Sequence, residues 1–450
     1  MFHRTRRWVS VVGSVALLAF GAMGGQAQKI KFTDTTLPNG LRVIIAEDHV
    51  APVFSVVVNY NVGSRNERAG RTGFAHLFEH MMFKGSENVG QGEHPYLMFM
   101  NGGNMNGTTN RDRTMYYETL PANQLDLALF LEADRMKSLA ITKDNLDNQR
   151  NAVQEERRLG VDNVPYGRVN DTLSRLAYSS FAYGHSVIGS MDDLSAATVD
   201  DVASFFKTYY APNNATIAIV GDVTAATALA KVKQYFGAIP RQPAPPPVDV
   251  TETAQTEEHR VTLSDPLARL PRLDMAYKTP ASSSPDYAAL TVLSNVLAGG
   301  RSARFYENIV RQKQIATNVS AGLPEQRGPS LFQIIATPAP NASVADIEAA
   351  IDAEIERVKA GPIADAELEK ARASAQRGLV SIQGSSLGRA IYLSQDAMFY
   401  NDPAWFEKDV ERVAKVTGAD VQRVAAKYLV KTNRTVVITM PKAPAGRGGK

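Results

Sequence analysis

The amino-acid sequence predicts an α+β protein made of two homologous domains, each an antiparallel-rich mixed sheet packed against helices. The chain has 450 residues, which exceeds one ordinary domain, and 44% of them are apolar, enough for two sizeable cores. In each half, short strand-like segments come before longer segments of helical periodicity. This order favours α+β sandwiches over a doubly wound sheet.

A recurring motif also indicates that the two halves are related. Residues 198–219 and 417–438 share Thr, Asp, Val, Tyr, Asn, Thr and Ile, and every matched pair lies 219 positions apart. Each segment has the pattern of a helix, a turn and a buried strand. Chance recurrence of a common helix–strand pattern is the alternative, but seven matches at one spacing favour duplication.

The individual elements are predicted from hydrophobic spacing. Short apolar or alternating runs indicate strands, whereas apolar residues three and four apart indicate helices. In the first half these patterns predict strands at 41–46 and 54–60 and helices at 73–82, 125–138 and 145–159. In the second half they predict strands at 273–277 and 331–337 and helices at 286–297, 344–359 and 365–381.

A proline-rich segment at residues 240–248 separates the two halves. Such a run favours extended polyproline geometry, which suits a semi-rigid spacer. We therefore predict an N-terminal domain over residues 28–239 and a C-terminal domain over residues 249–445.

The first 27 residues have the pattern of a secretory signal peptide. A basic head that includes Arg6 and Arg7 precedes an apolar stretch, and small residues lie at Gly25 and Ala27. The apolar stretch is too short to span a bilayer comfortably. We expect export across the inner membrane, a periplasmic location and no stable membrane anchor after signal removal. Ordinary secretion is favoured over the twin-arginine route.

Charge and cysteine content narrow the possible partners. Of the 49 Lys and Arg residues, three lie before residue 28, so the rest of the chain balances its 46 Asp and Glu residues. A balanced chain gives no support for a nucleic-acid partner. The chain has no cysteine, so stability in an oxidising compartment must come from packing.

The stretch His76-Leu-Phe-Glu79-His80 is a candidate metal site. Residues four apart lie on one face of a helix, so both imidazoles can aim at one point. Neutral imidazoles at this spacing suit Zn²⁺, and the order H-x-x-E-H is that of the inverted zincins. The alternative is a helix with two ordinary surface or core histidines. A third ligand should be acidic and come from another element, and helix 145–159 offers Glu155 and Glu156.

The motifs of the chain resemble those of the pitrilysin/insulinase metallopeptidases, and within them the mitochondrial processing peptidase-like branch. The resemblance covers nearly all of the chain after residue 27. It is carried by residues 37–44, 73–85, 102–109, 209–213 and 220–222.

The resemblance implies the remaining parts of the site. The family's third ligand is a glutamate about 76 residues after the second histidine, and that position is Glu156. One Zn²⁺ per chain, held by His76, His80 and Glu156, would activate a water, and Glu79 would act as general base. The N-terminal domain would then be catalytic, and the C-terminal domain would be a degenerate, inactive copy. Ligand type favours zinc over manganese or cobalt without proving it.

Several positions depart from the family pattern. The family often has a supporting glutamate seven residues before the third ligand, and Gln149 stands at that position. A glutamine can hydrogen-bond to a metal ligand but carries no charge. The usual Asn-Ala is Asn106-Gly107, in a stretch that resembles the edge strand along which substrate is bound. A plain turn is the alternative there, because the stretch is rich in Gly and Asn.

The substrate-gripping pair of the family is incomplete. Arg311 occupies the arginine position, but Asn318 stands where the family has tyrosine. Arg311 is equally well explained as a surface helix charge. The missing tyrosine suggests a dimer, in which a paralogous subunit that lacks the zinc motif supplies the pair.

These observations predict a secreted zinc metalloendopeptidase that hydrolyses oligopeptides or unfolded segments. A non-catalytic scaffold or a peptide-binding subunit of a related complex is the alternative. The sequence keeps all four residues that catalysis would need, which favours the enzyme. They are His76, Glu79, His80 and Glu156.

Overall fold

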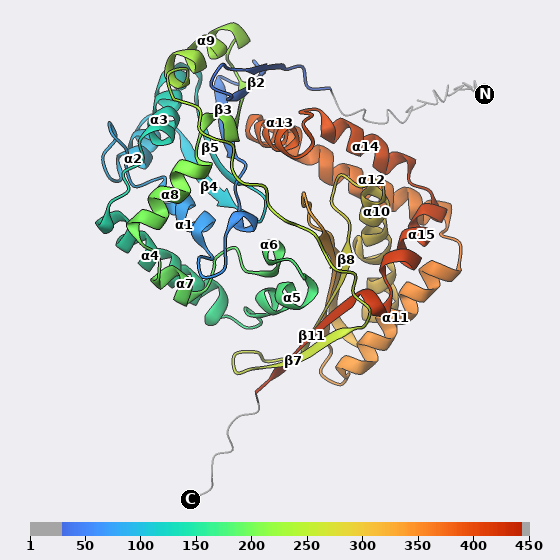
Figure 1. The fold of residues 1–450 in the computed structure, drawn as a ribbon. Coiled ribbons are helices and arrows are strands. Elements are labelled where there is room, and N and C mark those ends of the chain that lie inside the picture. The colour runs from blue at the N-terminus through green and yellow to red at the C-terminus, as the bar shows by residue number, and fades with distance from the viewer. Residues whose placement is uncertain (1–28, 443–450) are drawn as a thin grey trace, which may run out of the picture.

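The computed structural model describes residues 29–442, and its first half is built around a six-stranded sheet (Figure 1). The strands are β1 (Thr33–Thr36), β2 (Arg42–Glu47), β3 (Val53–Tyr60), β4 (Asn104–Thr109), β5 (Thr114–Pro121) and β6 (Ala215–Gly221). They are ordered β1-β2-β6-β3-β5-β4, and only β2 and β6 run parallel. Strand β4 therefore lies at one edge of the sheet.

The second half repeats this topology in a five-stranded sheet. Its strands are β7 (His259–Asp265), β8 (Arg272–Thr279), β9 (Ala316–Gly322), β10 (Ser330–Pro338) and β11 (Arg434–Pro441). They are ordered β7-β11-β8-β10-β9, and only β7 and β11 run parallel. Two antiparallel-rich mixed sheets packed against helices confirm the predicted fold class.

Helices cover both sheets. The first half contains α1 (Phe74–Met81), α2 (Glu93–Met100), α3 (Leu125–Lys137), α4 (Lys143–Arg157), α5 (Val169–Ala177), α6 (Phe181–Gly184), α7 (Met191–Ser195), α8 (Val199–Tyr209) and α9 (Ala225–Phe236). The second contains α10 (Asp286–Ala298), α11 (Val344–Ala360), α12 (Asp365–Ser381), α13 (Ser386–Tyr400), α14 (Trp405–Lys415) and α15 (Gly418–Tyr428). No helix of the described part of the chain is long and apolar enough to cross a bilayer.

The recurring motif folds in the same way in both halves. Helices α8 and α15 both begin with a Thr–Asp capping box. The asparagine after each helix, Asn214 or Asn433, donates its side-chain amide to the carbonyl of Tyr209 or Tyr428, at 2.8 Å in both cases. The shared polar residues therefore fix the same helix-to-strand connection twice, which supports duplication.

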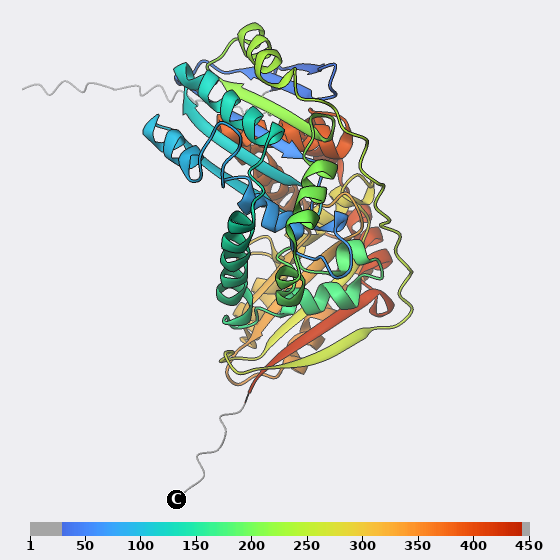
Figure 2. The same ribbon diagram turned by 60° about the vertical axis from the view of Figure 1, so that its left-hand side comes forward.

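Each half also covers the sheet of the other half with one helix (Figures 1 and 2). From the second half, α13 packs on β3 and β6, and Ala390, Leu393 and Ala397 join the apolar face of the first sheet. From the first half, α5 packs on β11 and β8, where Val169 and Leu173 join the second sheet. The two halves are thus held together by reciprocal apolar contacts.

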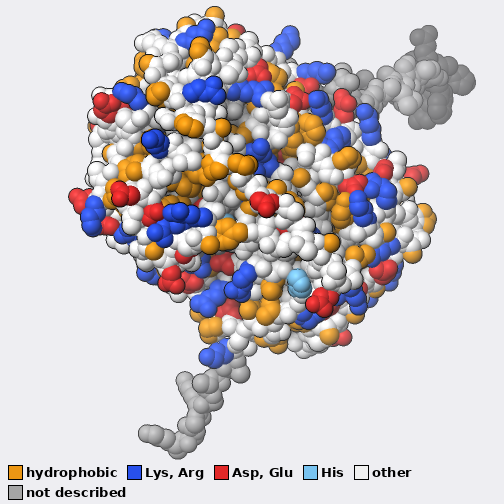
Figure 3. All heavy atoms as spheres, in the orientation of Figure 1, with side chains coloured by type: hydrophobic (Ala, Val, Ile, Leu, Met, Phe, Trp, Pro, Cys, Tyr) orange, Lys and Arg blue, Asp and Glu red, His pale blue; other side chains and the backbone are white. Residues whose placement is uncertain are grey.

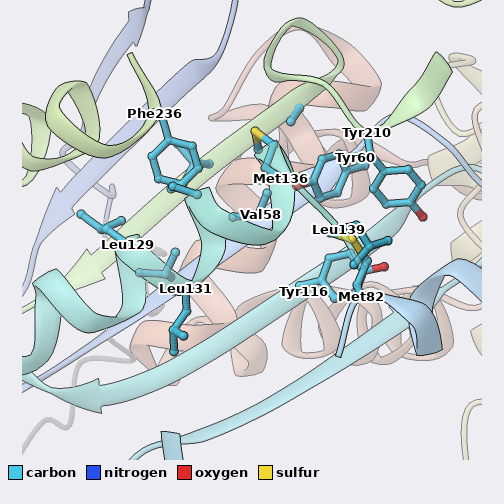
Figure 4. Close-up of a cluster of buried hydrophobic side chains, with 14 of the residues drawn as sticks. Val58, Tyr60, Met82, Tyr116, Leu129, Leu131, Met136, Leu139, Tyr210 and Phe236 are labelled. Atoms are coloured by element: carbon cyan, nitrogen blue, oxygen red, sulfur yellow. The ribbon is translucent and has the colours of Figure 1, made fainter. Parts of the chain in front are cut away.

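The largest core of the first half lies on the other face of its sheet, beneath α1, α3 and α9. Figure 4 shows part of it, where Leu129 and Leu131 of α3 lie near Phe236 of α9 and Tyr60 lies beside Tyr210. This packing fixes α1 against the sheet, and α1 carries the two histidines of the motif.

Residues 240–258 form neither helix nor strand and connect α9 to β7 (Figure 2). Gln242 is tied to the first half, because its amide N–H donates to Asn213 at 2.9 Å and its carbonyl accepts from Asn213 at 3.0 Å. The domain boundaries stay predictions, and the signal peptide predicted at residues 1–27 lies outside the described residues.

The visible surface mixes charges of both signs. Figure 3 shows Lys and Arg side chains interspersed with Asp and Glu over the face seen in Figure 1. This mixture agrees with the balanced charge of the chain after residue 27.

A fully buried polar cluster lies between α2, β5 and α3. His94 and Glu118 are joined at 2.8 Å, and Arg135 pairs with Glu132. The Arg135 guanidinium also stacks on Tyr116, 4.5 Å from the ring centroid. Burial raises the pKa of Glu118 and raises that of Glu132 to about 7, although Arg135 opposes the shift.

We expect Glu132 to make stability depend on pH. Because its pKa rises from 4.5 to about 7 on folding, the folded state holds a proton that the unfolded state has lost between these values. Stability therefore falls as pH rises through this window, and Glu132→Gln removes the effect. Urea titrations give the unfolding free energy of the wild type and of the variant at each pH. The wild-type value minus the variant value should fall by roughly 3 kcal/mol from pH 4.5 to 7.

The matched control is Glu155→Gln, because the Glu155 side chain is exposed on α4. Its unfolding free energy, relative to wild type, should stay constant over the same pH range. A constant difference for Glu132→Gln as well would contradict the assignment.

Candidate metal centre

Helices α1 and α4 bring His76, His80 and Glu156 together. Oxygen Oε2 of Glu156 lies 3.3 Å from Nε2 of His80 and 3.6 Å from Nε2 of His76. One donor atom from each residue lies within 4.8 Å of the others. Ligands of a tetrahedral zinc ion, each about 2.0–2.1 Å from the metal, lie roughly 3.4 Å apart. The arrangement therefore fits one zinc-sized ion.

The protonation state of His76 also fits a metal ligand. Burial, with the neighbouring His80 adding to it, lowers the pKa of His76 to about 4. A neutral imidazole forms no ion pair with Glu156 but has a free lone pair, which is the form that binds a metal. Nε2 of His76 faces the Glu156 carboxylate. Among the described residues, the other ring nitrogen, Nδ1, is buried without a hydrogen-bond partner.

Glu79 lies between this group and the edge strand. A Cβ atom added to Gly107 of β4 would lie only 2.9 Å from Cγ of Glu79, so the glycine allows the close approach. Burial raises the pKa of Glu79, and a hydrogen bond with the Thr109 side chain opposes the shift. A carboxylate with a raised pKa beside a free strand edge is suited to proton transfer.

A buried carboxylate fixes the N-terminal end of α1. Glu67 accepts the backbone N–H of Gly73 at 2.9 Å and that of Ala75 at 2.8 Å, and it contacts Nε2 of His185 at 3.0 Å. Gly73 has a φ of 86°, and an added Cβ would lie 2.6 Å from the carbonyl oxygen of Ile188. Neither Glu67 nor His185 belongs to a motif of the sequence, so neither was predicted as part of the site.

The C-terminal part of α4 is held just as firmly. Arg157, next to Glu156, donates to the carbonyl of Gly189 at 2.6 Å and to Asp171 at 3.2 Å. Glu155 instead accepts from Arg158 at 3.0 Å, away from the histidines. The predicted helix 145–159 in fact begins at Lys143, after a Thr142 cap, and gives way to a π-helical turn over Arg158–Asp162.

The lower-ranked site residues occupy different places. Gln149 is buried on α4 and donates to Asn148, and no hydrogen bond joins it to either histidine. Asn106 lies on β4 and accepts the N–H of Gly107 at 2.8 Å. Arg311 lies in the π-helical segment Tyr306–Gln312, exposed and paired with Glu307. Its substrate role stays a prediction.

A second group of potential ligands, His94, Glu118 and Glu132, lies in the buried cluster of α2, β5 and α3. Arg135 already supplies a positive charge there by pairing with Glu132. The group is therefore explained as a charge-compensated part of the core. His94 belongs to no motif of the sequence, because its partner Glu118 lies 24 positions away.

The site combines two imidazoles with two carboxylates. Glu79 lies on α1 with both histidines, and Glu156 comes from α4. This is the residue set of the inverted-zincin class of metallopeptidases. Comparison with known proteins agrees with this class. The family described as Insulinase (Peptidase family M16) matches residues 42–190, and the Peptidase M16 inactive domain matches residues 196–375. The chain belongs to the insulinase family of zinc proteases, peptidase family M16, as its motifs indicated.

Individual relatives match over almost the whole chain. The zinc protease PqqE of Helicobacter pylori is 31% identical over 445 residues, which cover 98% of this chain and all of the relative. The crystal structure of a protease from Helicobacter pylori superposes with a TM-score of 0.87 at 31% identity, over 92% of this chain and all of that chain. The periplasmic protease PqqL of Escherichia coli, at 18% identity, matches 92% of this chain with 48% of its own and has a TM-score of 0.76.

We expect zinc binding to depend on the three converging residues. His80→Ala or Glu156→Ala removes one donor, and the variant should lose most of its bound zinc after gel filtration, as measured by elemental analysis. Glu155→Ala, which changes the neighbouring residue on α4, should keep one zinc per chain. Full zinc content in the His80 and Glu156 variants would contradict the assignment.

Proposed function

We propose that this chain is a zinc-dependent endopeptidase that cuts extended peptides. The observation that carries the proposal is the placement of three donor atoms around one point, with Glu79 between that point and a free strand edge. The zinc protease names of the relatives support the same activity. His76, His80 and Glu156 would hold one Zn²⁺ per chain.

Each residue then has a distinct task. A zinc ion bound there would lower the pKa of a coordinated water and polarise the scissile carbonyl. Glu79 takes the proton of the attacking water and passes it to the leaving nitrogen. Glu67 and His185 keep α1 in place, and the packing of Gly107 against Glu79 keeps the base beside the substrate strand.

Strand β4 is the surface on which substrate is laid. Within residues 29–442 it is the last strand of its sheet and pairs only with β5. Asn110 donates to the carbonyl of Arg113 at 3.0 Å, so the alternation of antiparallel pairs directs the backbone groups of Thr109 and Gly107 toward the free edge. An extended peptide can add there as a further strand, whereas a folded protein cannot.

A non-catalytic peptide-binding subunit is the second candidate. Two observations favour it. The match to the inactive domain covers residues 196–375, and the supporting position on α4 holds the uncharged Gln149. The presence of His76, Glu79, His80 and Glu156 nevertheless favours an active peptidase over this second candidate.

Location and assembly are part of the proposal. The signal-like N-terminus and the fold shared with a periplasmic protease support a periplasmic enzyme. That protease is about twice as long as this chain, because the match takes only 48% of it. A dimer, formed with a second copy or with a paralogue lacking the zinc motif, would supply the second half. Only the paralogue could also supply the tyrosine that Asn318 replaces in this chain.

Glu79→Gln separates catalysis from metal binding. The variant should keep its zinc and lose at least a hundredfold in peptide hydrolysis, because the amide cannot accept the proton. A quenched fluorescent peptide with and without chelator measures the activity, and Glu155→Gln is the matched control. Normal hydrolysis by Glu79→Gln would remove this residue from the mechanism.

Substrate state should matter as much as sequence. We expect unfolded proteins and oligopeptides to be cut and native globular proteins to survive, because only extended chains can pair with β4. Mass spectrometry of a digest of one protein before and after urea denaturation tests this. Equal cutting of both forms would exclude the strand-addition mode.

Activity should also depend on a partner. The purified chain alone should be weakly active, and adding a paralogous subunit without the zinc motif should increase kcat/KM. Light scattering and peptide assays of the same samples measure both properties. Full activity of the chain as a homodimer would exclude the heterodimer.

A further inference from the structure

A large cavity lies next to the candidate metal centre, between the two halves. Its volume is about 1030 Å³. Its wall includes Glu156, the loop after α4, one face of α5, and Ser320–Gly322 of β9 in the second half. Arg111, from the tip of the β4–β5 hairpin, also lines it.

Arg111 is held with donors to spare. One terminal nitrogen, Nη2, donates to Ser174 of α5 at 2.7 Å, and Nη1 reaches Gln326 at 3.4 Å. Within residues 29–442 its Nε is buried without a hydrogen-bond partner, so a ligand would meet the second N–H of each terminal nitrogen. The guanidinium carbon lies 6.0 Å from the centroid of the Tyr178 ring, which helps to orient it.

Within residues 29–442, no carboxylate lies within 4.0 Å of Arg111. The neighbouring hairpin residue Asp112 is instead used by Arg65, at 3.3 Å, and by Tyr183, at 2.7 Å. Arg272, on the same cavity wall, pairs with Asp274 at 2.8 Å. Arg111 is therefore a positioned guanidinium whose charge is not compensated by a direct ion pair.

The position of Arg111 relative to β4 connects it to the substrate. The strand runs past Gly107, opposite Glu79, and ends at Thr109, two residues before Arg111. Gly107 and Thr109 are two extended residues apart, roughly 7 Å, and Arg111 follows in the hairpin turn. A peptide laid along β4 across the reactive centre therefore leads toward the turn that carries this side chain.

We propose that Arg111 binds a carboxylate of the peptide substrate through a two-point hydrogen bond. A guanidinium fork matches a carboxylate in shape and charge, and burial of part of Arg111 increases the selectivity for an anion. This inference rests on the proposed function, because it assumes that peptides lie along β4. It adds a preference for acidic substrates that the metal site does not predict.

The direction of the bound peptide decides the source of the carboxylate. Antiparallel pairs outnumber parallel ones, and an antiparallel peptide places its residues N-terminal to the cut bond near Arg111. The carboxylate then belongs to an Asp or Glu before the cut bond. A parallel peptide would instead bring an acidic residue or the C-terminal carboxylate there.

The test measures binding without turnover. Zinc-loaded Glu79→Gln is titrated with fluorescent decapeptides in which a single Glu is moved through every position. Each peptide is compared with its Gln counterpart, and each is made with a C-terminal acid and with an amide. Cleavage of the same peptides by the wild type, mapped by mass spectrometry, locates the cut bond.

Two further variants assign any preference to a residue. Arg111→Gln removes the guanidinium, and Arg272→Gln removes one charge from the same cavity wall and serves as the control for long-range electrostatics. Thermal unfolding and zinc content of each variant separate binding effects from misfolding, and Arg111→Lys asks whether the charge suffices without the fork.

We expect one position at which Glu binds about tenfold tighter than Gln. The preference should vanish in Arg111→Gln, weaken in Arg111→Lys and remain in Arg272→Gln. A preference for the free C-terminal acid that depends on Arg111 would support the same site with a chain end as the ligand.

The proposal would be overturned if Arg111→Gln and the parent protein with Arg111 bound every peptide with equal affinity. It would also be overturned if neither protein bound any peptide. The experiment distinguishes failure of the peptidase function from failure of the Arg111 proposal. Selective binding without cleavage by the wild type would contradict the peptidase function alone, whereas cleavage without an Arg111-dependent preference would contradict this inference alone.

Discussion

Helices α1 and α4 must converge on one point for the candidate metal centre to exist. Two histidines on α1 can share an ion only if α4 brings Glu156 to them, and the two helices are separated by more than sixty residues. Glu67 fixes the first turn of α1 through two backbone hydrogen bonds, and Arg157 ties the end of α4 to Gly189. Gly189 itself packs against Gly73, so both anchors meet at one loop.

The duplicated scaffold serves this convergence. Each half contributes one helix to the sheet of the other half, so the halves are joined through α5 and α13 as well as through residues 240–258. Because α5 also carries Ser174, which contacts Arg111, the same arrangement places a cavity beside Glu156. The cavity thus borders the metal group through Glu156 and the tip of the β4–β5 hairpin through Arg111, although these residues come from distant parts of the sequence.

Local patterns predicted much of this. The fold class, strands β2, β3, β8 and β10 and several long helices followed from hydrophobic spacing, and the motif on α1 followed from its two histidines four positions apart. Helix α13 was not predicted. Strand β5 was missed, because its polar residues, such as Glu118, are buried in pairings with distant partners. Residues that act through tertiary contacts, such as Glu67 and Arg111, left no local signal. His185 lies 118 positions from Glu67, and Gln326 lies 215 positions from Arg111.

Only one of two adjacent acids on α4 reaches the histidines. Glu155 and Glu156 are neighbours in sequence, yet Glu155 pairs with Arg158 and Glu156 meets both imidazoles. Anomalous diffraction at the zinc edge from crystals of the zinc-loaded chain tests the metal centre itself. One strong peak is expected between His76 Nε2, His80 Nε2 and Glu156. Its absence at saturating zinc, or a peak elsewhere alone, would contradict the metal centre and the peptidase built on it.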